Sequence, residues 1–404
     1  MKIAVVGGGA AGFFSALTAK ENFPQAQVYI FEKARRLLSK VRISGGGRCN
    51  VTHACPTVED LCAAYPRGGR KLKKAFHIFN NTHTCAWFEA RGVPLVVQED
   101  NCVFPASQNS QSIIDCFMRE AERLEININC GVGVTALTAG NEGLELSFDV
   151  PGRQPEVFDK VIVASGGSPK QEGLQWLEAL GHKIETPVPS LFTFNMPGES
   201  VTKLMGVVVP DVVAGIQGTK LRAAGPLLIT HWGMSGPAII NLSSLGARLL
   251  NEKNYSFVVQ LNWVNQQNTL AVAENLQRIA SAHAARAIHN FRPYDLPSRL
   301  WEYLLAKCGM AHDKTWEELG KKGLNKIVNV LTNDTYQVQG QTTFREEFVT
   351  CGGVSLDSID LNTMQSKVCR NLYFAGEVLD IDGITGGYNF QCAWTTGFIA
   401  GKLQ

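Results

Sequence analysis

The chain opens with two short apolar runs that flank a helical stretch. Residues 2–6 and 27–31 are apolar and rich in β-branched side chains, which is typical of buried strands. Residues 13–20, between them, have the composition of a helix. Strand, helix and strand in this order predict a β-α-β unit with two parallel strands. A glycine-rich turn, residues 7–12, joins the first strand to the helix, and Glu32 ends the second strand.

The turn has the glycine spacing of a dinucleotide site, with an acid twenty residues after the third glycine. Gly7 makes the tight turn, Gly9 lets backbone N–H groups approach a pyrophosphate, and Gly12 lets the helix pack closely on the strand. The helix N-terminus adds a positive dipole end and unpaired N–H donors. Glu32 is expected to accept hydrogen bonds from ribose hydroxyls. The expected contacts in this unit are Gly7, Gly9, Ala10, Ala11, Gly12 and Glu32.

The hydrophobic pattern changes along the rest of the chain and predicts three parts. Pro187-Val-Pro189 indicates a linker, and residues 189–263 contain short β-branched runs that predict an inserted β-domain. Residues 264–339 have helical periodicity and predict a cap over the active-site cleft. The expected fold is therefore α/β, with a parallel sheet in a discontinuous Rossmann-like dinucleotide domain formed by residues 1–188 and 340–404.

Composition narrows the class of protein. The 404 residues, 45% of them hydrophobic and 18% charged, fit a globular protein with two or three domains. A net charge of +2 provides no general attraction to nucleic acids or membranes, and no apolar run has the roughly 18 residues of a membrane-spanning helix. Eleven cysteines without a C-x-x-C pair suit a reducing compartment. We therefore expect a soluble, cytoplasmic protein.

A second glycine-rich motif follows the β-α-β unit at residues 44–52 (Ser-Gly-Gly-Gly-Arg-Cys-Asn-Val-Thr). Its glycines permit positive φ angles and a close approach of the backbone to a flat ligand. Arg48 and Asn50 place side-chain donors beside them, and Lys40 precedes the motif, where it would face a phosphate. For Arg35 and Arg36, a solvated basic loop is an equal alternative. No metal site is expected, because the nearby candidate ligands match no zinc spacing: Cys49, His53 and Cys55.

The pattern K-x-x-x-S-G-G-G-R-C-N-x-T resembles the aminoacetone-oxidase-like family of FAD-binding flavoproteins, which includes relatives of the bile-acid-pathway flavoprotein. Family members usually have Asn directly after this pattern, where this chain has His53. The resemblance covers nearly the whole chain and implies a glutathione-reductase-like fold that binds FAD. The contacts that it implies in this region are Lys33, Lys40, Ser44, Gly45, Gly46, Arg48, Cys49 and Asn50.

Two segments in the middle of the first domain extend the resemblance. In glutathione-reductase-like flavoproteins, a strand that corresponds to residues 132–137 gives backbone groups to the adenine. Residues 161–167 resemble the A-T-G-G turn of FAD proteins, with Ser165 where Thr is common. An ordinary strand-to-helix turn is the alternative for this segment. The implied contacts are Val134, Ala164, Ser165 and Gly166.

Residues 371–383 resemble the second flavin motif, in which a strand ends on Ala-Gly-Glu and an acid holds the ribityl chain or the phosphates. The helix predicted over residues 390–403 would point its N-terminus at the flavin N1–C2=O edge and stabilise the anionic reduced flavin. This half of the site lies over 330 residues from the first and favours FAD over NAD as the bound cofactor. Its implied contacts are Gly376, Glu377, Asp380, Gly387, Tyr388, Asn389 and Phe390.

These features predict an FAD-dependent oxidoreductase that transfers two electrons through flavin N5 to an unidentified small organic substrate. No second glycine fingerprint follows a strand, so NAD(P)H, a plausible donor, would bind only transiently. Residues 230–237 resemble a family signature, T-H-x-G-x-S-G-P, that begins a helix. His231 and Tyr388 are the candidate catalytic proton donors, and a structural histidine is an equal alternative for His231. The sequence does not indicate an oligomeric state.

Two other functions stay open. The first is a nucleic-acid-modifying flavoprotein, similar to the folate- and FAD-dependent tRNA modifiers. Its support is the basic run Arg67–Lys74, which opens a helix expected to run to about Arg91. A solvated helix start also explains this run, so nucleic acid is not the expected partner. The second is a flavin protein whose redox state signals to a partner without turnover.

Overall fold

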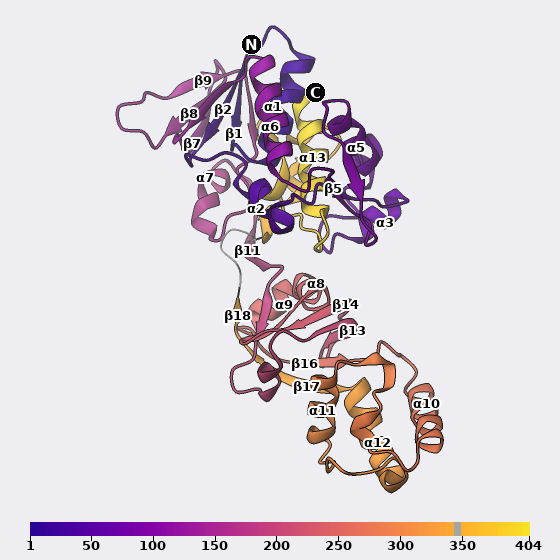
Figure 1. The fold of residues 1–404 in the computed structure, drawn as a ribbon. Coiled ribbons are helices and arrows are strands. Elements are labelled where there is room, and N and C mark those ends of the chain that lie inside the picture. The colour runs from indigo at the N-terminus through magenta and orange to yellow at the C-terminus, as the bar shows by residue number, and fades with distance from the viewer. Residues whose placement is uncertain (343–348) are drawn as a thin grey trace. The chain divides into compact units, whose positions relative to one another are not determined.

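The computed structural model describes residues 1–342 and 349–404. Among these residues, 1–190 and 349–404 form one compact unit, and 191–342 form a second (Figure 1). Residues 343–348, over which the chain was expected to return to the first domain, lie outside the described residues. The division of the second unit into a β-domain and a helical cap stays a prediction.

A seven-stranded sheet forms the centre of the first unit, in the order β20-β21-β22-β10-β1-β2-β6. Its strands from β22 to β6 are parallel, and β20 and β21 add an antiparallel edge. The strands are β1 (Lys2–Val6), β2 (Gln27–Glu32), β6 (Asn127–Cys130), β10 (Lys160–Val163), β20 (Ile359–Asp360), β21 (Gln365–Ser366) and β22 (Leu372–Phe374). The predicted Rossmann-like α/β fold is confirmed.

Helices α1 (Ala10–Asn22) and α13 (Tyr388–Gly401) lie side by side (Figure 1). They approach closely because glycines of α13 face the contact. A Cβ atom on Gly401 would lie 2.6 Å from the carbonyl oxygen of Ser15. The C-terminal helix is therefore held against the helix that follows the first glycine turn.

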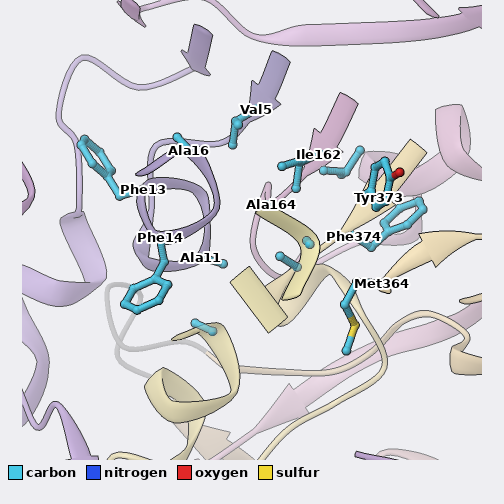
Figure 2. Packing of buried hydrophobic residues seen from close by; sticks show 14 of the residues in the cluster. Val5, Ala11, Phe13, Phe14, Ala16, Ile162, Ala164, Met364, Tyr373 and Phe374 are labelled. Carbon is cyan, nitrogen blue, oxygen red and sulfur yellow. The ribbon is translucent and has the colours of Figure 1, made fainter. Parts of the chain in front are cut away.

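The core of this unit joins the strands to α1. Figure 2 shows five of its members: Phe13 and Phe14 on α1, Val5 on β1, Ile162 on β10 and Phe374 on β22. All five are fully buried. Burial of such side chains stabilises a fold by about 1.5–3 kcal/mol each. A parallel sheet is covered on both faces, which explains why its strands are almost continuously apolar.

Between β2 and β6 the chain leaves the sheet and forms short helices and a small antiparallel sheet of order β3-β5-β4. The single helix expected to open at the basic run Arg67–Lys74 and to continue to about Arg91 is two helices. Asn80 separates them, because its side chain accepts from the backbone of Thr82 and caps the second helix. The elements are α2 (Ser39–Gly47), β3 (Thr52–His53), α3 (Val58–Ala63), α4 (Lys73–Ile78), α5 (Asn81–Glu89), β4 (Leu95–Val97), β5 (Cys102–Pro105) and α6 (Gln111–Arg123).

After β6, three strands form an antiparallel meander, β7-β8-β9. Farther on, β11 pairs with β19, so residues 187–189 belong to a strand, where we had expected a linker. Pro187 lies in a bulge that interrupts the pairing between Glu185 and Val188. Pro189 is paired with Thr350, but the ladder has only two strands, so β11 is an edge strand, where proline is tolerated. The remaining elements are β7 (Val134–Ala139), β8 (Leu144–Phe148), β9 (Glu156–Phe158), η1 (Gln171–Leu174), α7 (Gln175–Glu178), β11 (Ile184–Ser190), β19 (Val349–Val354), η6 (Leu356–Ser358) and η7 (Gly376–Val378).

The second unit has its own sheet, in the order β17-β16-β13-β14-β15-β12-β18, and its own hydrophobic core. Its strands are β12 (Thr193–Asn195), β13 (Val208–Ile216), β14 (Arg222–Ile229), β15 (Gly233–Ser235), β16 (Ser256–Asn262), β17 (Asp334–Gln339) and β18 (Gln341–Thr342). Its helices are η2 (Ser200–Leu204), α8 (Pro237–Leu245), α9 (Ala247–Glu252), α10 (Thr269–Ala282), η3 (Ile288–Asn290), η4 (Pro293–Asp295), α11 (Ser298–Lys307), η5 (Glu317–Leu319) and α12 (Gly320–Thr332). Among the described residues of the whole chain, no helix has the length and apolarity needed to cross a bilayer.

Candidate functional site

In the first glycine turn, packing requires glycine at two positions, whereas a third glycine has room for a side chain. Gly7 has a φ of +113°, and a Cβ there would overlap the Ala164 carbonyl. A Cβ on Gly12 would overlap the carbonyl oxygen of Gly7. Gly9, by contrast, faces open space, since a Cβ there would meet no atom within 4 Å. The space lies at the N-terminus of α1, where backbone N–H groups favour a phosphate.

Glu32 lies beside this turn, as the fingerprint predicts. Its two carboxylate oxygens accept from the N–H groups of Gly8 (2.7 Å) and Ala34 (2.8 Å). Its carbonyl oxygen accepts from the N–H of Val132, two residues before Val134. The acid, the turn and the start of β7 therefore lie together. Lys33, which follows the acid, is exposed to solvent.

The second glycine motif ends α2 with a change of backbone conformation. Ser44 is extended, and Gly45, Gly46 and Gly47 have φ values of +58°, +68° and +84°. A Cβ on Gly46 or Gly47 would meet nothing within 4 Å, so this loop also presents bare backbone to open space. The side chain of Cys49 is turned into the core, where burial raises the pKa of its thiol to about 12. Cys49 can therefore offer a ligand only its backbone.

Arg48 and Asn50 are both fixed by neighbours. The Arg48 guanidinium lies over the Phe104 ring, 4.1 Å from its centroid. The Asn50 amide donates to the Thr52 carbonyl (2.9 Å) and accepts from the N–H of Gly387 (3.2 Å). Asn50 thus joins the second glycine motif to the start of α13.

Lys40 and Glu377 bring the two halves of the predicted site together. Lys40 Nζ lies 2.6 Å from Glu377 Oε2, and Glu377 Oε1 accepts from the N–H of Thr350 (2.9 Å). The Thr350 hydroxyl is buried and has no hydrogen-bond partner among residues 1–342 and 349–404. A Cβ on Gly167 would overlap this hydroxyl and lie 2.5 Å from Glu377 Oε1. An unsatisfied buried hydroxyl beside a glycine turn is the kind of group that a bound ligand completes.

The turn at residues 164–167, which follows β10, lies at the same edge of the sheet as the first glycine turn. Ala164 follows β10 and packs against the first glycine turn, and Gly376 follows β22 next to the Cβ of Ala11. Ser165 is exposed, and Gly166 has a φ of +76° and open space around it. The carboxyl ends of the parallel strands thus form the crevice in which such folds bind dinucleotides.

The loop before α13 is held rigidly against the second motif. Gly387 caps α13 with a φ of +90°, and a Cβ there would lie 2.7 Å from the backbone of Thr52. Asn389 exchanges two hydrogen bonds with the backbone of Gly383. The Phe390 ring is stacked over Trp394. Asp380 follows η7, where it is half-buried.

The candidate proton donor Tyr388 is buried at this point. Its hydroxyl faces the thiol of Cys55 at 4.0 Å, its ring stacks on His53, and its carbonyl accepts from the Tyr65 hydroxyl. Burial raises the pKa of the Tyr388 hydroxyl well above its ordinary value. A catalytic role for Tyr388 stays a prediction.

His231 lies in the second unit, on the turn between β14 and β15, whereas all the predicted cofactor contacts lie in the first. The His231 side chain is exposed, and the edge of its ring meets Trp232, whose indole nitrogen donates to Thr193. Gly236 caps α8 with a φ of +91°, and Pro237 is its first residue, as the signature predicts. The catalytic role of His231 also stays a prediction.

Sequence reasoning missed a buried acid beside the site. Asp382 is fully buried, forms a paired hydrogen bond with the Arg67 guanidinium and accepts from the Ser190 hydroxyl (2.7 Å). Burial raises the pKa of this carboxyl, and Arg67 opposes that effect. Arg67 therefore belongs to an internal ion pair, although the sequence places it in a surface-like basic run. A second acid two residues after Asp380 was the available signal.

The parallel sheet, the two glycine loops that present bare backbone and the unsatisfied hydroxyl define a Rossmann-fold protein with a dinucleotide site. A model of the HI0933-like protein Rossmann domain family matches residues 1–403. The chain belongs to this family of FAD-binding flavoproteins, and its cofactor is FAD.

Several known proteins are similar over the whole chain. A 3-dehydro-bile acid delta(4,6)-reductase of Clostridium scindens is 26% identical over 409 residues, which cover 99% of this chain and 98% of the relative. A ribosomal RNA dihydrouridine synthase of Escherichia coli is 27% identical over 409 residues, covering 98% and 95%. The structure of a 3-ketosteroid delta1-dehydrogenase from Sterolibacterium denitrificans has a TM-score of 0.50 at 12% identity, covering 99% and 98%, and shares the fold.

Proposed function

We propose that the protein is an NAD(P)H-linked, FAD-dependent reductase of a small organic molecule whose carbon–carbon double bond is conjugated to a carbonyl group. The observation that carries the proposal is the meeting of two glycine-rich halves in one unit. Lys40 Nζ lies 2.6 Å from Glu377 Oε2, and open space lies beside Gly9 and Gly46. This is the arrangement that an extended dinucleotide with a flat ring system requires.

The substrate class comes from chemistry that two relatives share. A 3-dehydro-bile acid delta(4,6)-reductase adds hydrogen to double bonds conjugated to a ketone, and a dihydrouridine synthase adds hydrogen to a double bond conjugated to a pyrimidine carbonyl. In a reduction of this kind a hydride adds to one carbon of the double bond, at the electron-poor end of the conjugated system, and a proton adds to the other carbon. The balanced reaction consumes one NAD(P)H and one proton for each double bond saturated.

The residues of the first unit bind and orient the cofactor in this scheme. The N-terminus of α1 binds the pyrophosphate, Glu32 accepts from the ribose, and Lys40 neutralises phosphate charge. The N-terminus of α13, capped by Gly387, would stabilise negative charge on the pyrimidine ring of a bound flavin. When bound, FAD supplies hydride transfer at N5. Tyr388 and His231 are the candidates for delivering the proton.

The test is anaerobic mixing of the FAD-loaded protein with NADPH or NADH, followed by a panel of acceptors. We expect the 450 nm flavin band to bleach with a reduced nicotinamide and to return with a conjugated enone, but not with the saturated ketone of the same skeleton. Failure of every donor to bleach the band, or equal reoxidation by the saturated ketone, would contradict the proposal.

A second candidate is reduction of a uracil ring within RNA, because two relatives at 26–27% identity are ribosomal RNA dihydrouridine synthases. The positive charge of the basic run that supported an RNA partner is partly neutralised within the unit. Three of its cations form ion pairs: Arg67 with Asp382, Lys71 with Asp357 and Lys73 with Glu59. A uridine-containing ribosomal RNA fragment in the acceptor panel separates the two candidates. Bleaching without reoxidation by any acceptor would instead favour a redox sensor.

A further inference from the structure

His53, the last residue of β3, lies against the loop that precedes α13. Its Nδ1 is 3.2 Å from the Gly386 carbonyl oxygen, and its ring stacks on Tyr388 with centroids 4.7 Å apart. The backbones behind these groups are in contact, since a Cβ on Gly387 would lie 2.7 Å from the carbonyl of Thr52. His53 is therefore fixed at the N-terminus of α13.

The Gly386 carbonyl decides which ring nitrogen of His53 carries the proton. A carbonyl oxygen can only accept, so Nδ1 carries the hydrogen, and Nε2 of the neutral ring has a free lone pair. Within the described parts of the chain, Nε2 makes no hydrogen bond, and the ring is only half-buried. Nε2 is thus an available proton acceptor beside the expected position of the flavin.

The groups that face this ring keep it neutral in the structure described. Burial lowers the pKa of His53 below its ordinary value, and the Gly386 carbonyl and the charge of Asp100 oppose that effect less strongly. Cys102 Sγ lies 4.0 Å from Nδ1, and burial raises the pKa of this thiol to about 11. Tyr388 is likewise un-ionised at neutral pH. The positive end of α13 also disfavours an imidazolium.

We propose that His53 Nε2 binds a proton when the bound flavin accepts two electrons. The inference rests on FAD binding with its pyrimidine edge at the start of α13, the placement used in the proposed function. The negative charge that reduction places on that ring favours an adjacent imidazolium, which burial and the helix dipole otherwise oppose. His53 thereby adds a charge-compensating group to the site.

The step balances with an external reductant. Two electrons go from the reductant to the flavin, one proton goes from water to flavin N5, and a second proton goes from water to His53 Nε2. Both protons return to water when the two electrons leave. No bond to carbon forms or breaks at His53.

The test is the midpoint potential of the FAD-loaded full chain, measured between pH 7 and 8.5 with dithionite and redox dyes. For a two-electron couple, each proton taken up contributes about 30 mV per pH unit. We expect two protons per two electrons in the wild-type protein and one in His53→Asn, whose amide can still donate to Gly386 but cannot bind a proton. The control is His77→Asn, an exposed histidine on α4, which should behave as wild type.

The midpoint potential could depend on pH with the same slope in the wild-type protein and in His53→Asn. That result would overturn the proposal, whether the slope corresponds to one proton or to two. If His53→Asn does not retain FAD, nitrogen-15 NMR of the wild-type histidines gives the same answer, and unchanged protonation of His53 on reduction would overturn the proposal. Because dithionite replaces both nicotinamide and substrate, this result is independent of whether the protein reduces an enone.

Discussion

The Lys40 ammonium lies 2.6 Å from the Glu377 carboxylate, although 337 residues separate them in the chain. Lys40 precedes the second glycine motif, and Glu377 follows β22 at the opposite end of the sequence. The other oxygen of Glu377 accepts from the Thr350 amide, so the carboxylate is held from two sides. This relationship places both halves of the predicted cofactor site at one edge of one sheet.

Replacement of Lys40 by Met should weaken cofactor binding with little effect on folding. The side chain of Lys40 is 44% exposed, and exposed ion pairs contribute up to about 1 kcal/mol to stability. We expect the free energy of unfolding to fall by less than about 1 kcal/mol. The Kd for FAD should rise about tenfold, because a charged contact to phosphate is lost. Flavin fluorescence titration and urea unfolding measure the two quantities.

The matched control is Lys73→Met, which removes an ion pair of the same length, with Glu59, outside the site. It should leave the Kd for FAD unchanged. An unchanged Kd in Lys40→Met, combined with a loss of several kcal/mol in stability, would show that the ion pair is purely structural.

Alanine substitutions of Gly9 and Gly12 should have different effects: the first should weaken cofactor binding, and the second should reduce the stability of the fold. Gly9 has an extended backbone that alanine tolerates, and an added methyl group there would meet no atom within 4 Å, so Gly9→Ala should unfold at the wild-type urea concentration without FAD. That methyl group would occupy the space of the pyrophosphate and should weaken FAD binding at least tenfold. Gly12→Ala should lose about 1–3 kcal/mol or more in stability, because its methyl group overlaps the carbonyl of Gly7. Wild-type FAD affinity in Gly9→Ala would contradict the assignment of this turn.

Gln391 should be important for stability, because it lies at the centre of a buried polar network on α13. Its side-chain oxygen accepts from the hydroxyls of Thr52 (2.6 Å) and Thr84 (2.9 Å), and its nitrogen donates to Thr395 (3.0 Å). Gln391→Leu leaves these hydroxyls without that partner, at a cost of about 1–3 kcal/mol for each unsatisfied group. We expect a loss of about 2–5 kcal/mol in urea unfolding.

The double variant Gln391→Leu with Thr84→Val tests the cause of that loss. Removing one of the unsatisfied hydroxyls should recover part of the stability, so the two substitutions should be less than additive. Strict additivity would mean that Thr84 and Gln391 are not energetically coupled.

The stability of the first unit should decrease as the pH is lowered, because the buried side chain of His182 must then bind a proton. This side chain is 2% exposed, contacts the Ser366 hydroxyl and the Phe374 ring, and burial lowers its pKa to about 4. The unfolded chain binds the proton near the ordinary pKa of about 6.5, so the contribution is complete above that pH and is lost as the pH falls towards 4.

The expected slope is up to about 1.4 kcal/mol per pH unit in this window. Urea unfolding of the wild-type protein and His182→Gln at pH 7 and pH 5 gives the difference between their slopes. Parallel pH dependence of the two proteins would show that His182 is not the group responsible.

The first β-α-β unit could be predicted because the sequence signals for its strands lie within the strands themselves. The strand before Gly7 and the strand that ends on Glu32 are apolar runs with β-branched residues, and their pairing is parallel as the pattern requires. The break at Asn80 was missed because the helical period continues across it, and only its capping hydrogen bonds stop the helix. Residues 187–189 were misjudged because a bulge at Pro187 and the edge position of the strand in a two-stranded ladder allow prolines within a paired strand.

The site could be predicted as a set of segments, but not as a set of contacts. Gly9 and Gly12 belong to one motif, but the motif does not reveal that Gly12 serves packing whereas Gly9 faces open space. The ion pair between Lys40 and Glu377 forms because the tertiary fold brings together two distant segments, and spacing along the sequence cannot predict such a contact. The spacing of Asp382 from Asp380 marks it as a second acid of the motif but does not reveal its partners, the Arg67 guanidinium and the Ser190 hydroxyl.

The most direct test of the central claim is FAD binding by the apo protein, measured by titration calorimetry for the wild type, Gly9→Ala and Glu377→Gln. The account predicts one FAD per chain for the wild-type protein, and a Kd at least tenfold higher in each variant, since each changes a different half of one site. A folded wild-type protein that binds no FAD, or a Kd insensitive to one of the two substitutions, would contradict it.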